Sequence, residues 1–283
     1  MASKKIGQEM SNKEYRQHEG ISKSDLMKLT VSPKFFKYSM DNPSTLKTHD
    51  LTFGSAAHKW ILEKDDFFNE FIIEEKFDRR SKEGKALAEE FELRKGDKEV
   101  ISQEDFDTIK AMADELLKNK WARILLDGNH EESFFWKDKE TGEQCKCRPD
   151  CYTEYKGQHI IVDYKTTRNP EKNAFQKSIE NYGYDLQAGM YCEGMKEITG
   201  NDYDFVFIAQ EKKPPYDFNI FQCNDELMTS GRNLFHLLIK KLHECKVNND
   251  WHGVIEDENK ITELGLPPWS NGVPDSSESE DFE

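Results

Sequence analysis

The stretch of sequence that decides the fold is RPDCYTEYKGQHIIVDYKTT, residues 148–167. Residues 160–162 are apolar at consecutive positions, so a strand over 159–165 is predicted to be buried on both faces, as at the centre of a sheet. Because residues two apart in a strand share a face, Asp163 and Lys165 point the same way. Burying such charges at the end of a strand costs free energy unless they are paired with each other or bind a ligand.

A second carboxylate is predicted to approach this pair. Lys156-Gly157 has the composition of a tight turn, which would fold the flanking strands together and bring Asp150 towards Asp163. Two carboxylates beside a lysine suit phosphodiester cleavage. Carboxylate oxygens hold Mg²⁺, the ion lowers the pKa of a bound water, and Lys165 can orient that water or neutralise developing charge. The alternative is an ordinary ion pair on the surface of a sheet.

Periodicity around this stretch predicts a mixed α/β (α+β) domain, with a central mixed sheet flanked by helices. A period of two indicates strands over 132–137, 144–154, 159–165, 204–209 and 217–222. Helical spacing indicates helices over 53–62, 102–126, up to about 197, and over 225–247. We expect a flexible N-terminus over 1–19, one domain over 20–255 with an N-terminal helical part, and a disordered acidic tail over 256–283.

The charge is uneven along the chain. The formal net charge is −15, from 55 acidic and 40 basic side chains, but residues 256–283 alone hold nine acids and one base. Residues 1–50 have a net charge of +3. Although DNA binding is dominated by cations that meet phosphates, more than half of the acidic excess lies in the tail. The net charge therefore does not exclude DNA as a substrate.

Composition also limits the class of protein. No run of eighteen apolar residues is present, which excludes a membrane-spanning helix, and the N-terminus lacks the apolar stretch of a signal peptide. Six cysteines in 283 residues do not form a disulfide scaffold. We therefore expect a cytoplasmic protein without a membrane partner. Cysteines 145, 147 and 151 would share one strand face, which closes a tetrahedral metal site poorly, so we expect them to pack in the core.

Two helical motifs add candidate site residues. Gly54 and His58 are four residues apart on one helical face; the glycine would let the helix approach another backbone closely, and the imidazole could bind a metal. Tyr184, Gln187 and Tyr191 follow one face of a later helix. An ordinary helical histidine and a half-buried aromatic face are the alternatives.

Taken in order, Gly-x-x-x-His, Pro-Asp, Asp-x-Lys and Gln-x-x-x-Tyr resemble the RecB-like branch of the PD-(D/E)XK nucleases. The closest resemblance is to RecE-type (exonuclease VIII) exonucleases, with a more distant one to lambda exonuclease. Segments 21–26 and 78–85 are also similar to stretches common in that group. The resemblance covers roughly residues 20–250 and implies a restriction-endonuclease-like core.

The resemblance implies roles for individual residues. Lys165, Asp163, Asp150, Gln187 and Tyr191 would be catalytic. The metal would be bound by His58, Asp150, Asp163 and the backbone carbonyl of Tyr164, with Glu132 as an outer-shell acid. The cofactor would be Mg²⁺, with Mn²⁺ able to substitute. Since no cysteine follows Cys245, we expect no iron–sulfur cluster.

Basic residues outside this core are candidates for DNA binding. They are Arg79, Arg80, Lys82 and Lys85 in one cluster, and Ser22, Lys23 and Ser24 in another. A solvated charged loop explains the first cluster equally well, and helix capping explains the serines.

The implied function is digestion of linear double-stranded DNA from its 5′ ends. The products would be 3′ single strands, which a RecT-like annealing protein would use in recombination. The resemblance also implies a homo-oligomeric ring in a bacterial or phage-infected cell. The alternatives are a structure-specific or single-strand endonuclease and a non-catalytic DNA-binding or inhibitory module. The acidic tail, which ends near Phe282, is expected to aid solubility, or else to bind a basic pocket on a partner.

Overall fold

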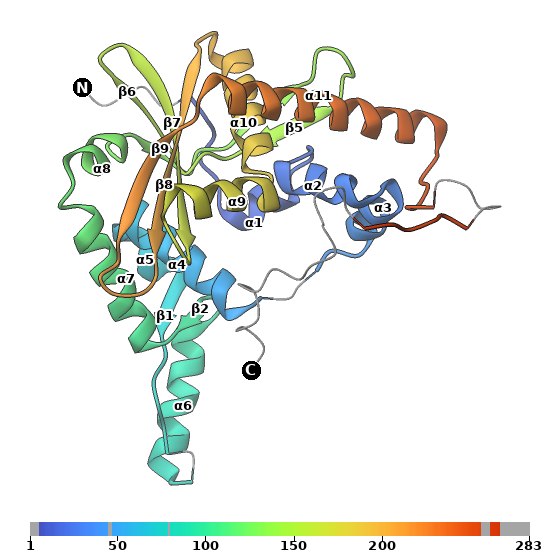
Figure 1. Cartoon of the computed structure of the whole chain (residues 1–283). Helices are drawn as coiled ribbons and strands as arrows, with labels where there is room; N and C mark the ends of the chain where they lie inside the picture. The colour runs from blue at the N-terminus through green and yellow to red at the C-terminus, as the bar shows by residue number, and fades with distance from the viewer. Residues whose placement is uncertain (1–5, 45–46, 79, 256–260, 267–283) are drawn as a thin grey trace.

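The computed structural model of the chain describes residues 6–44, 47–78, 80–255 and 261–266. At its centre lies a five-stranded sheet (Figure 1), in the order β3 (Asn129–His130), β6 (Cys151–Tyr155), β7 (Gln158–Thr167), β8 (Tyr203–Glu211) and β9 (Phe218–Gln222). β7 and β8 run parallel, whereas the other neighbouring strands are antiparallel. The sheet is therefore mixed, as predicted.

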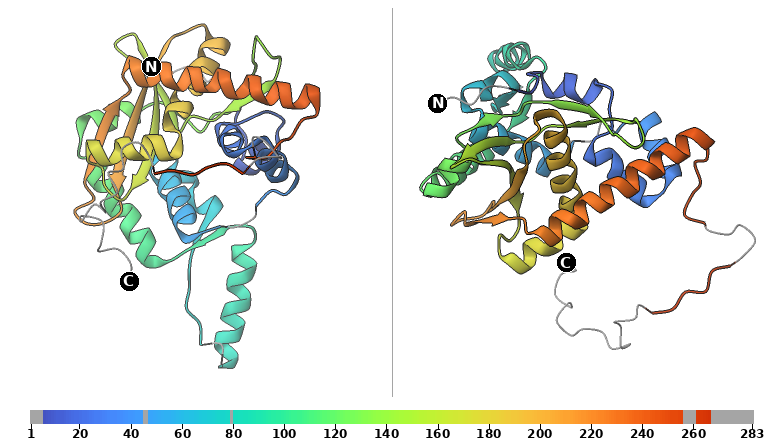
Figure 2. Two further views of the ribbon diagram at one scale, coloured as in Figure 1. Left: turned by 45° about the vertical axis from the view of Figure 1, so that its right-hand side comes forward. Right: turned by 90° about the horizontal axis from the view of Figure 1, so that it is seen from above.

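Helices cover both faces of this sheet (Figures 1 and 2). One face packs against α2 (Lys23–Val31), α9 (Lys172–Tyr182), α10 (Tyr184–Thr199) and α11 (Asp225–Asn248). The other packs against α4 (His49–Leu62), α7 (Gln103–Leu116) and α8 (Lys120–Leu125). Within β7, Ile161 contributes to the first core, while Ile160 and Val162 contribute to the second. The predicted fold class and the predicted central buried strand are confirmed.

The strand predicted over 144–154 is interrupted. β5 (Gln144–Cys147) pairs with β4 (Phe134–Lys137) in a separate two-stranded sheet, whereas β6 begins at Cys151 in the central sheet. Pro149 lies in the break, where its ring fixes φ and removes a backbone donor. The cysteines at 145, 147 and 151 are buried but do not share one strand. The chain thus changes sheets immediately before Asp150.

The helix predicted over 102–126 is also divided. Asn119 accepts hydrogen bonds from the N–H groups of Trp121 and Ala122, which starts α8 as a helix separate from α7. Such side-chain caps compete with helix continuation. The apolar spacing of the two helices is continuous enough that periodicity alone did not separate them.

The described part of the N-terminus contacts the domain, although the sequence predicts a flexible segment over 1–19. Gln8 and Ser133 exchange two backbone hydrogen bonds of 2.9 Å. A capping box between Ser11 and Glu14 starts α1 (Asn12–Gln17). Residues 6–19 therefore lie along the edge of β4 and β5 rather than apart from the domain, because their backbone groups find partners there.

A helical extension projects from the body of the molecule (Figures 1 and 2). β1 (Phe71–Ile73) pairs in parallel with β2 (Glu99–Ile101), and α6 (Lys82–Lys95) lies between them in sequence. Only three residues of α6 are buried, so its sequence lacks the apolar spacing by which the other helices were predicted. The remaining elements are α3 (Pro33–Asp41), the 3-10 helix η1 (Lys64–Asp66) and α5 (Phe67–Glu70).

The predicted acidic tail lies mostly outside the described residues. Residues 261–266 are exposed and belong to no helix or strand, and the rest of the segment after residue 255 is not described. Within the described ranges, no helix is both long and apolar enough to cross a bilayer.

Two glycines in helix interiors differ in what surrounds them. A Cβ on Gly231 of α11 would lie 1.9 Å from the Asp185 carbonyl oxygen of α10, so these helices meet backbone to backbone. Gly54 of α4 was expected to allow such an approach, but its Cβ would only meet Thr166 Oγ1 at 3.8 Å, an ordinary contact. That expectation was wrong, because Gly54 is not among the buried residues of α4, which are Phe53, Ala56, Ala57 and Leu62.

We expect Gly231→Ala to lower the free energy of unfolding by about 3 kcal/mol, because the methyl group must force two helices apart. Gly54→Ala is the matched control, and it should leave stability unchanged or raise it by up to about 1 kcal/mol through helix propensity. Urea unfolding followed by circular dichroism measures both. Equal effects of the two substitutions would contradict the close approach of α10 and α11.

Candidate active site

The β6–β7 hairpin brings the two predicted carboxylates towards each other. Lys156 and Gly157 have φ values of 53° and 83°, so the predicted two-residue turn is confirmed. Asp150, immediately before β6, accepts a 2.7 Å hydrogen bond at Oδ2 from the Tyr164 N–H of β7. The carbonyl of a strand residue points to the same neighbour as its N–H, so the Tyr164 carbonyl also faces this side.

His58 reaches the same point from α4. Its Nδ1 atom lies 3.2 Å from Asp150 Oδ2, and its ring meets Tyr164 edge-to-face with centroids 5.3 Å apart. The helix is held against this face of the sheet by its buried Ala56 and Ala57. The structure therefore brings His58 and Asp150 together, as the ordered motifs suggested.

Glu131, rather than the predicted Glu132, joins this pair. One possible ligand atom from each of His58, Glu131 and Asp150 lies within 4.8 Å of the other two. Glu131 has a φ of 53°, which interrupts the alternation of a strand and turns its side chain towards the site. The Glu132 carboxylate instead accepts a 2.7 Å hydrogen bond from the Tyr152 hydroxyl and a 2.8 Å bond from a backbone N–H. Strand alternation alone could not distinguish these neighbours.

Asp163 and Lys165 form the second part of the site, on the face of β7 that meets α10. Asp163 is only 1% exposed, pairs with Lys165 and accepts a hydrogen bond from Gln187. Tyr191 lies one turn after Gln187 and is half-buried beside Phe205, with ring centroids 6.4 Å apart. The predicted Asp163, Lys165 and Gln187 are therefore in direct contact, and Tyr191 borders them.

Burial and mutual repulsion set the protonation of the carboxyl groups. Burial, with the Asp150 charge, raises the pKa of Glu131 to about 7 and that of Asp163 to about 6. Burial would also raise the pKa of Asp150, but His58, Lys165 and the Tyr164 N–H outweigh it and lower that pKa. Asp150 is thus the carboxylate that stays charged, whereas its two acidic neighbours take up protons near neutral pH.

The two cationic groups respond in the opposite way. Burial would lower the pKa of Lys165, but Asp163 and Asp150 outweigh it and raise that pKa further above its usual value. Burial also opposes the charged form of His58, and the Asp150 carboxylate again raises the pKa overall. Lys165 is therefore an ammonium group at neutral pH and cannot act as a general base.

Comparison with known proteins identifies the family to which this chain belongs. The model of the family described as "PDDEXK-like domain of unknown function (DUF3799)" matches residues 22–258. The chain belongs to this family. The predicted PD-(D/E)XK superfamily is therefore confirmed, whereas the closer resemblance to RecE-type exonucleases stays a prediction.

A solved structure shows the same fold. A protein from Eubacterium rectale described as "Putative exonuclease" aligns with a TM-score of 0.59 at 13% identity, over 92% of this chain and 97% of that one. A second protein, SSO0001, aligns with a TM-score of 0.40 at 12% identity over 81% of each chain. A search of curated protein sequences found no match.

The basic residues predicted to bind DNA lie in two places around this PDDEXK-like domain. Lys82 and Lys85 are exposed near the start of α6, next to the exposed Arg80, at the projecting tip (Figure 1). Lys82 and Lys85 belong to a capped helix rather than a loop. All three residues lie away from the central sheet. Arg79 lies outside the described residues.

The second group begins α2 and reaches the site. Ser22 caps the helix in a capping box with Asp25, and its hydroxyl lies 2.9 Å from that of Ser24, so capping accounts for Ser22. Lys23 is different, because its ammonium lies over the ring of Tyr184, 5.4 Å from the centroid. Burial and the nearby Lys165 charge lower the pKa of Lys23 to about 8.

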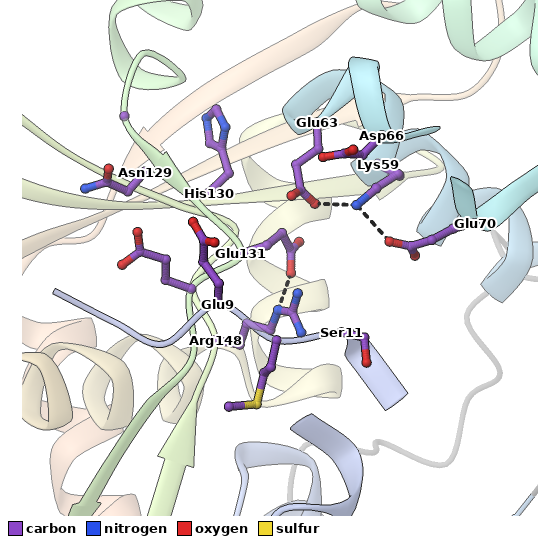
Figure 3. Close-up of a pocket in the computed structure, with 13 residues that line it drawn as sticks. Glu9, Ser11, Lys59, Glu63, Asp66, Glu70, Asn129, His130, Glu131 and Arg148 are labelled. Carbon is purple, nitrogen blue, oxygen red and sulfur yellow. Dashed lines mark hydrogen bonds and ion pairs between the residues drawn. The ribbon is translucent and has the colours of Figure 1, made fainter. Parts of the chain in front are cut away.

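An acidic cavity of about 560 Å³ adjoins the other side of the site (Figure 3). Glu131 and Glu132 line it together with Glu9, Glu63, Asp66 and Glu70. Lys59 is paired with Glu63 at 2.9 Å and with Glu70 at 2.7 Å, and Arg148 Nε lies 2.7 Å from Glu131. The cations that line this cavity are thus paired, so its charge opposes the entry of a phosphate chain.

We expect the affinity for a divalent cation to rise with pH. Glu131 and Asp163, with pKa values of about 7 and 6, are protonated at pH 5.5 and must lose their protons before they can ligate. The dissociation constant for Mg²⁺ should therefore fall more than about 10-fold between pH 5.5 and 7.5. Isothermal titration calorimetry at both values measures this.

Glu131→Gln should flatten this pH dependence, whereas Glu70→Gln, a change in the adjoining cavity, should leave it as in the wild type. A dissociation constant that does not change with pH in the wild-type protein would contradict the assignment of these carboxyl groups to the metal.

Proposed function

We propose that this PDDEXK-like domain is a Mg²⁺-dependent DNA exonuclease that hydrolyses phosphodiester bonds of linear double-stranded DNA. The observation that carries the proposal is the convergence of His58, Glu131 and Asp150 beside the Asp163–Lys165 pair. The nuclease-like fold of the family and the description of the Eubacterium rectale protein support it. The order of motifs along the chain supports it independently.

The donor set fits a divalent metal. Buried carboxyl groups with raised pKa values beside an imidazole gain a counter-charge when a cation binds. Asp150, Asp163 and Glu131 supply the oxygen atoms that Mg²⁺ prefers, and His58 also suits Mn²⁺. The bound ion would polarise the phosphate and lower the pKa of a water.

The protein's own groups then have separate tasks. Lys165 remains protonated, so it stabilises the negative charge that develops on the phosphate and donates hydrogen bonds to the attacking water or to phosphate oxygen. Gln187 donates a hydrogen bond to Asp163 and so holds this carboxylate in position. Asp163 in turn holds the Lys165 ammonium. Tyr191 is proposed to position the DNA backbone from the next turn of α10.

Further features of this proposal rest on the resemblance to RecE-type enzymes. They are 5′ to 3′ polarity, 3′ single-stranded products, a ring-shaped homo-oligomer and a single-strand annealing protein as partner. A cytoplasmic location is proposed from the composition. Arg80, Lys82 and Lys85 are proposed to contact the phosphates of the duplex from the tip of α6.

A cleavage assay with linear and closed circular duplex DNA tests the activity. In the presence of Mg²⁺, the wild type should degrade the linear form only, because an exonuclease needs an end. Lys165→Ala should lower the cleavage rate at least about 100-fold, since it removes the cation that stabilises the negative charge of the transition state. Chelation of the metal should abolish the activity.

Lys120→Ala is the control for the loss of one lysine, because Lys120 is exposed on α8 across the sheet. Cutting of closed circles would contradict the exonuclease and favour an endonuclease on the same core. DNA that is bound but never cut would favour the non-catalytic module.

Replacing Arg80, Lys82 and Lys85 together with alanine should weaken the binding of all duplex sequences equally. For every phosphate that a removed side chain had neutralised, the slope of log affinity against log salt concentration should become shallower by about 0.9. Fluorescence anisotropy over a range of salt concentrations measures the slope. A matched triple variant of Lys110, Lys118 and Lys120 removes the same charge from α7, α8 and the turn between them, and it should keep the slope. An unchanged slope in the first variant would rule out phosphate binding at the tip.

A further inference from the structure

A row of aromatic rings leads from the core to the surface beside the catalytic lysine. Phe207 of β8 packs against Tyr184, with ring centroids 5.6 Å apart, and Tyr184 packs against Tyr182, also at 5.6 Å. Phe175 of α9 contacts both Phe207 and Tyr184. Tyr182 is the outer end of this row, and its side chain is 60% exposed.

The backbone between α9 and α10 holds these rings in place. Gly183 has a φ of 60°, which lets one helix end at Tyr182 and the next begin at Tyr184. A Cβ on Gly183 would lie 2.3 Å from the sulfur of Met27, so the joint is packed tightly against α2. Lys23 also donates a hydrogen bond to the Tyr182 carbonyl. Two contacts from α2 therefore hold the backbone that carries the exposed ring.

Positive charge flanks the same row. The ammonium groups of Lys165 and Lys23 lie 5.1 Å and 5.4 Å from the centroid of the Tyr184 ring. A phosphate held near Lys165 would thus have a second cation nearby and an aromatic surface next to it. The opposite side of the site opens into the acidic cavity of Figure 3, where a phosphate chain is repelled. These charges favour passage of the strand over Tyr184 and Tyr182.

We propose that the ring of Tyr182 is a stacking surface for an unpaired base next to the phosphate that lies at Lys165, so that the strand in the site is single-stranded there. This inference rests on the proposed nuclease function and specifies its substrate. Aromatic stacking tolerates every base, because each base has a π-face. A base inside a duplex is already stacked on its neighbours, so only a frayed or single-stranded nucleotide can use this ring.

The test compares Tyr182→Ala with Tyr182→Phe, which keeps the ring and removes only the hydroxyl. Initial cleavage rates with Mg²⁺ are measured on a single-stranded oligonucleotide and on a linear duplex with a frayed end. Tyr182→Ala should raise KM about 10-fold, the loss expected for one stacked base, and Tyr182→Phe should match the wild type. Trp121→Ala, which removes a 51% exposed ring on α8 across the sheet, should also match the wild type.

Single abasic sites at successive positions from the strand end locate the stacked base. One position should raise KM for the wild-type protein, and Tyr182→Ala should be insensitive to the abasic site at that position, because the partner ring is already gone. Equal KM values for Tyr182→Ala and the wild type, or an equal loss in Tyr182→Phe or Trp121→Ala, would overturn the proposal. If the wild type cleaves no DNA, the proposed function itself fails, which is a different outcome from cleavage that ignores Tyr182.

Discussion

The site depends on one hydrogen bond, from the Tyr164 N–H of β7 to the Asp150 carboxylate, 2.7 Å long. Immediately before β6, the side chain of Asp150 accepts a hydrogen bond from a backbone N–H of β7 that would otherwise have no partner. This is possible because Pro149 lies where the chain leaves β5 and passes to the central sheet. The same contact holds Asp150 beside His58, so backbone pairing and the proposed metal chemistry share one carboxylate.

Charge balance around that carboxylate explains the rest of the site. Three buried acids cannot all be ionised without counter-charges, and the structure supplies Lys165, His58 and Arg148. Burial, together with the Asp150 charge, nevertheless raises the pKa values of Glu131 and Asp163. A bound divalent cation would favour the charged forms of these two acids. The acidic cavity lies on one side of the site, and the row of aromatic rings with Lys165 lies on the other. This difference in charge favours the approach of a DNA strand from the side of the aromatic row.

Patterns local in sequence predicted much of this arrangement. The apolar run before Asp163 identified the central strand, and Lys156-Gly157 identified the turn that pairs it with β6. The single strand predicted over 144–154 was wrong because a proline break carries no signal in hydrophobic alternation. The resemblance implied Glu132 as an outer-shell acid. Glu131 was not predicted as a site residue, since its positive φ does not follow from residue type.

The sequence by itself determined the mixed α/β class, the buried central strand and the candidate set of His58, Asp150, Asp163 and Lys165, because these follow from periodicity, turn composition and ordered motifs. Only the tertiary structure decided that Glu131 joins the metal-binding candidates and that Lys23 reaches the site from α2. It also decided that Tyr182 stands exposed at the end of an aromatic row. These are contacts between elements distant in the chain, and they depend on packing and backbone conformation that no local pattern encodes.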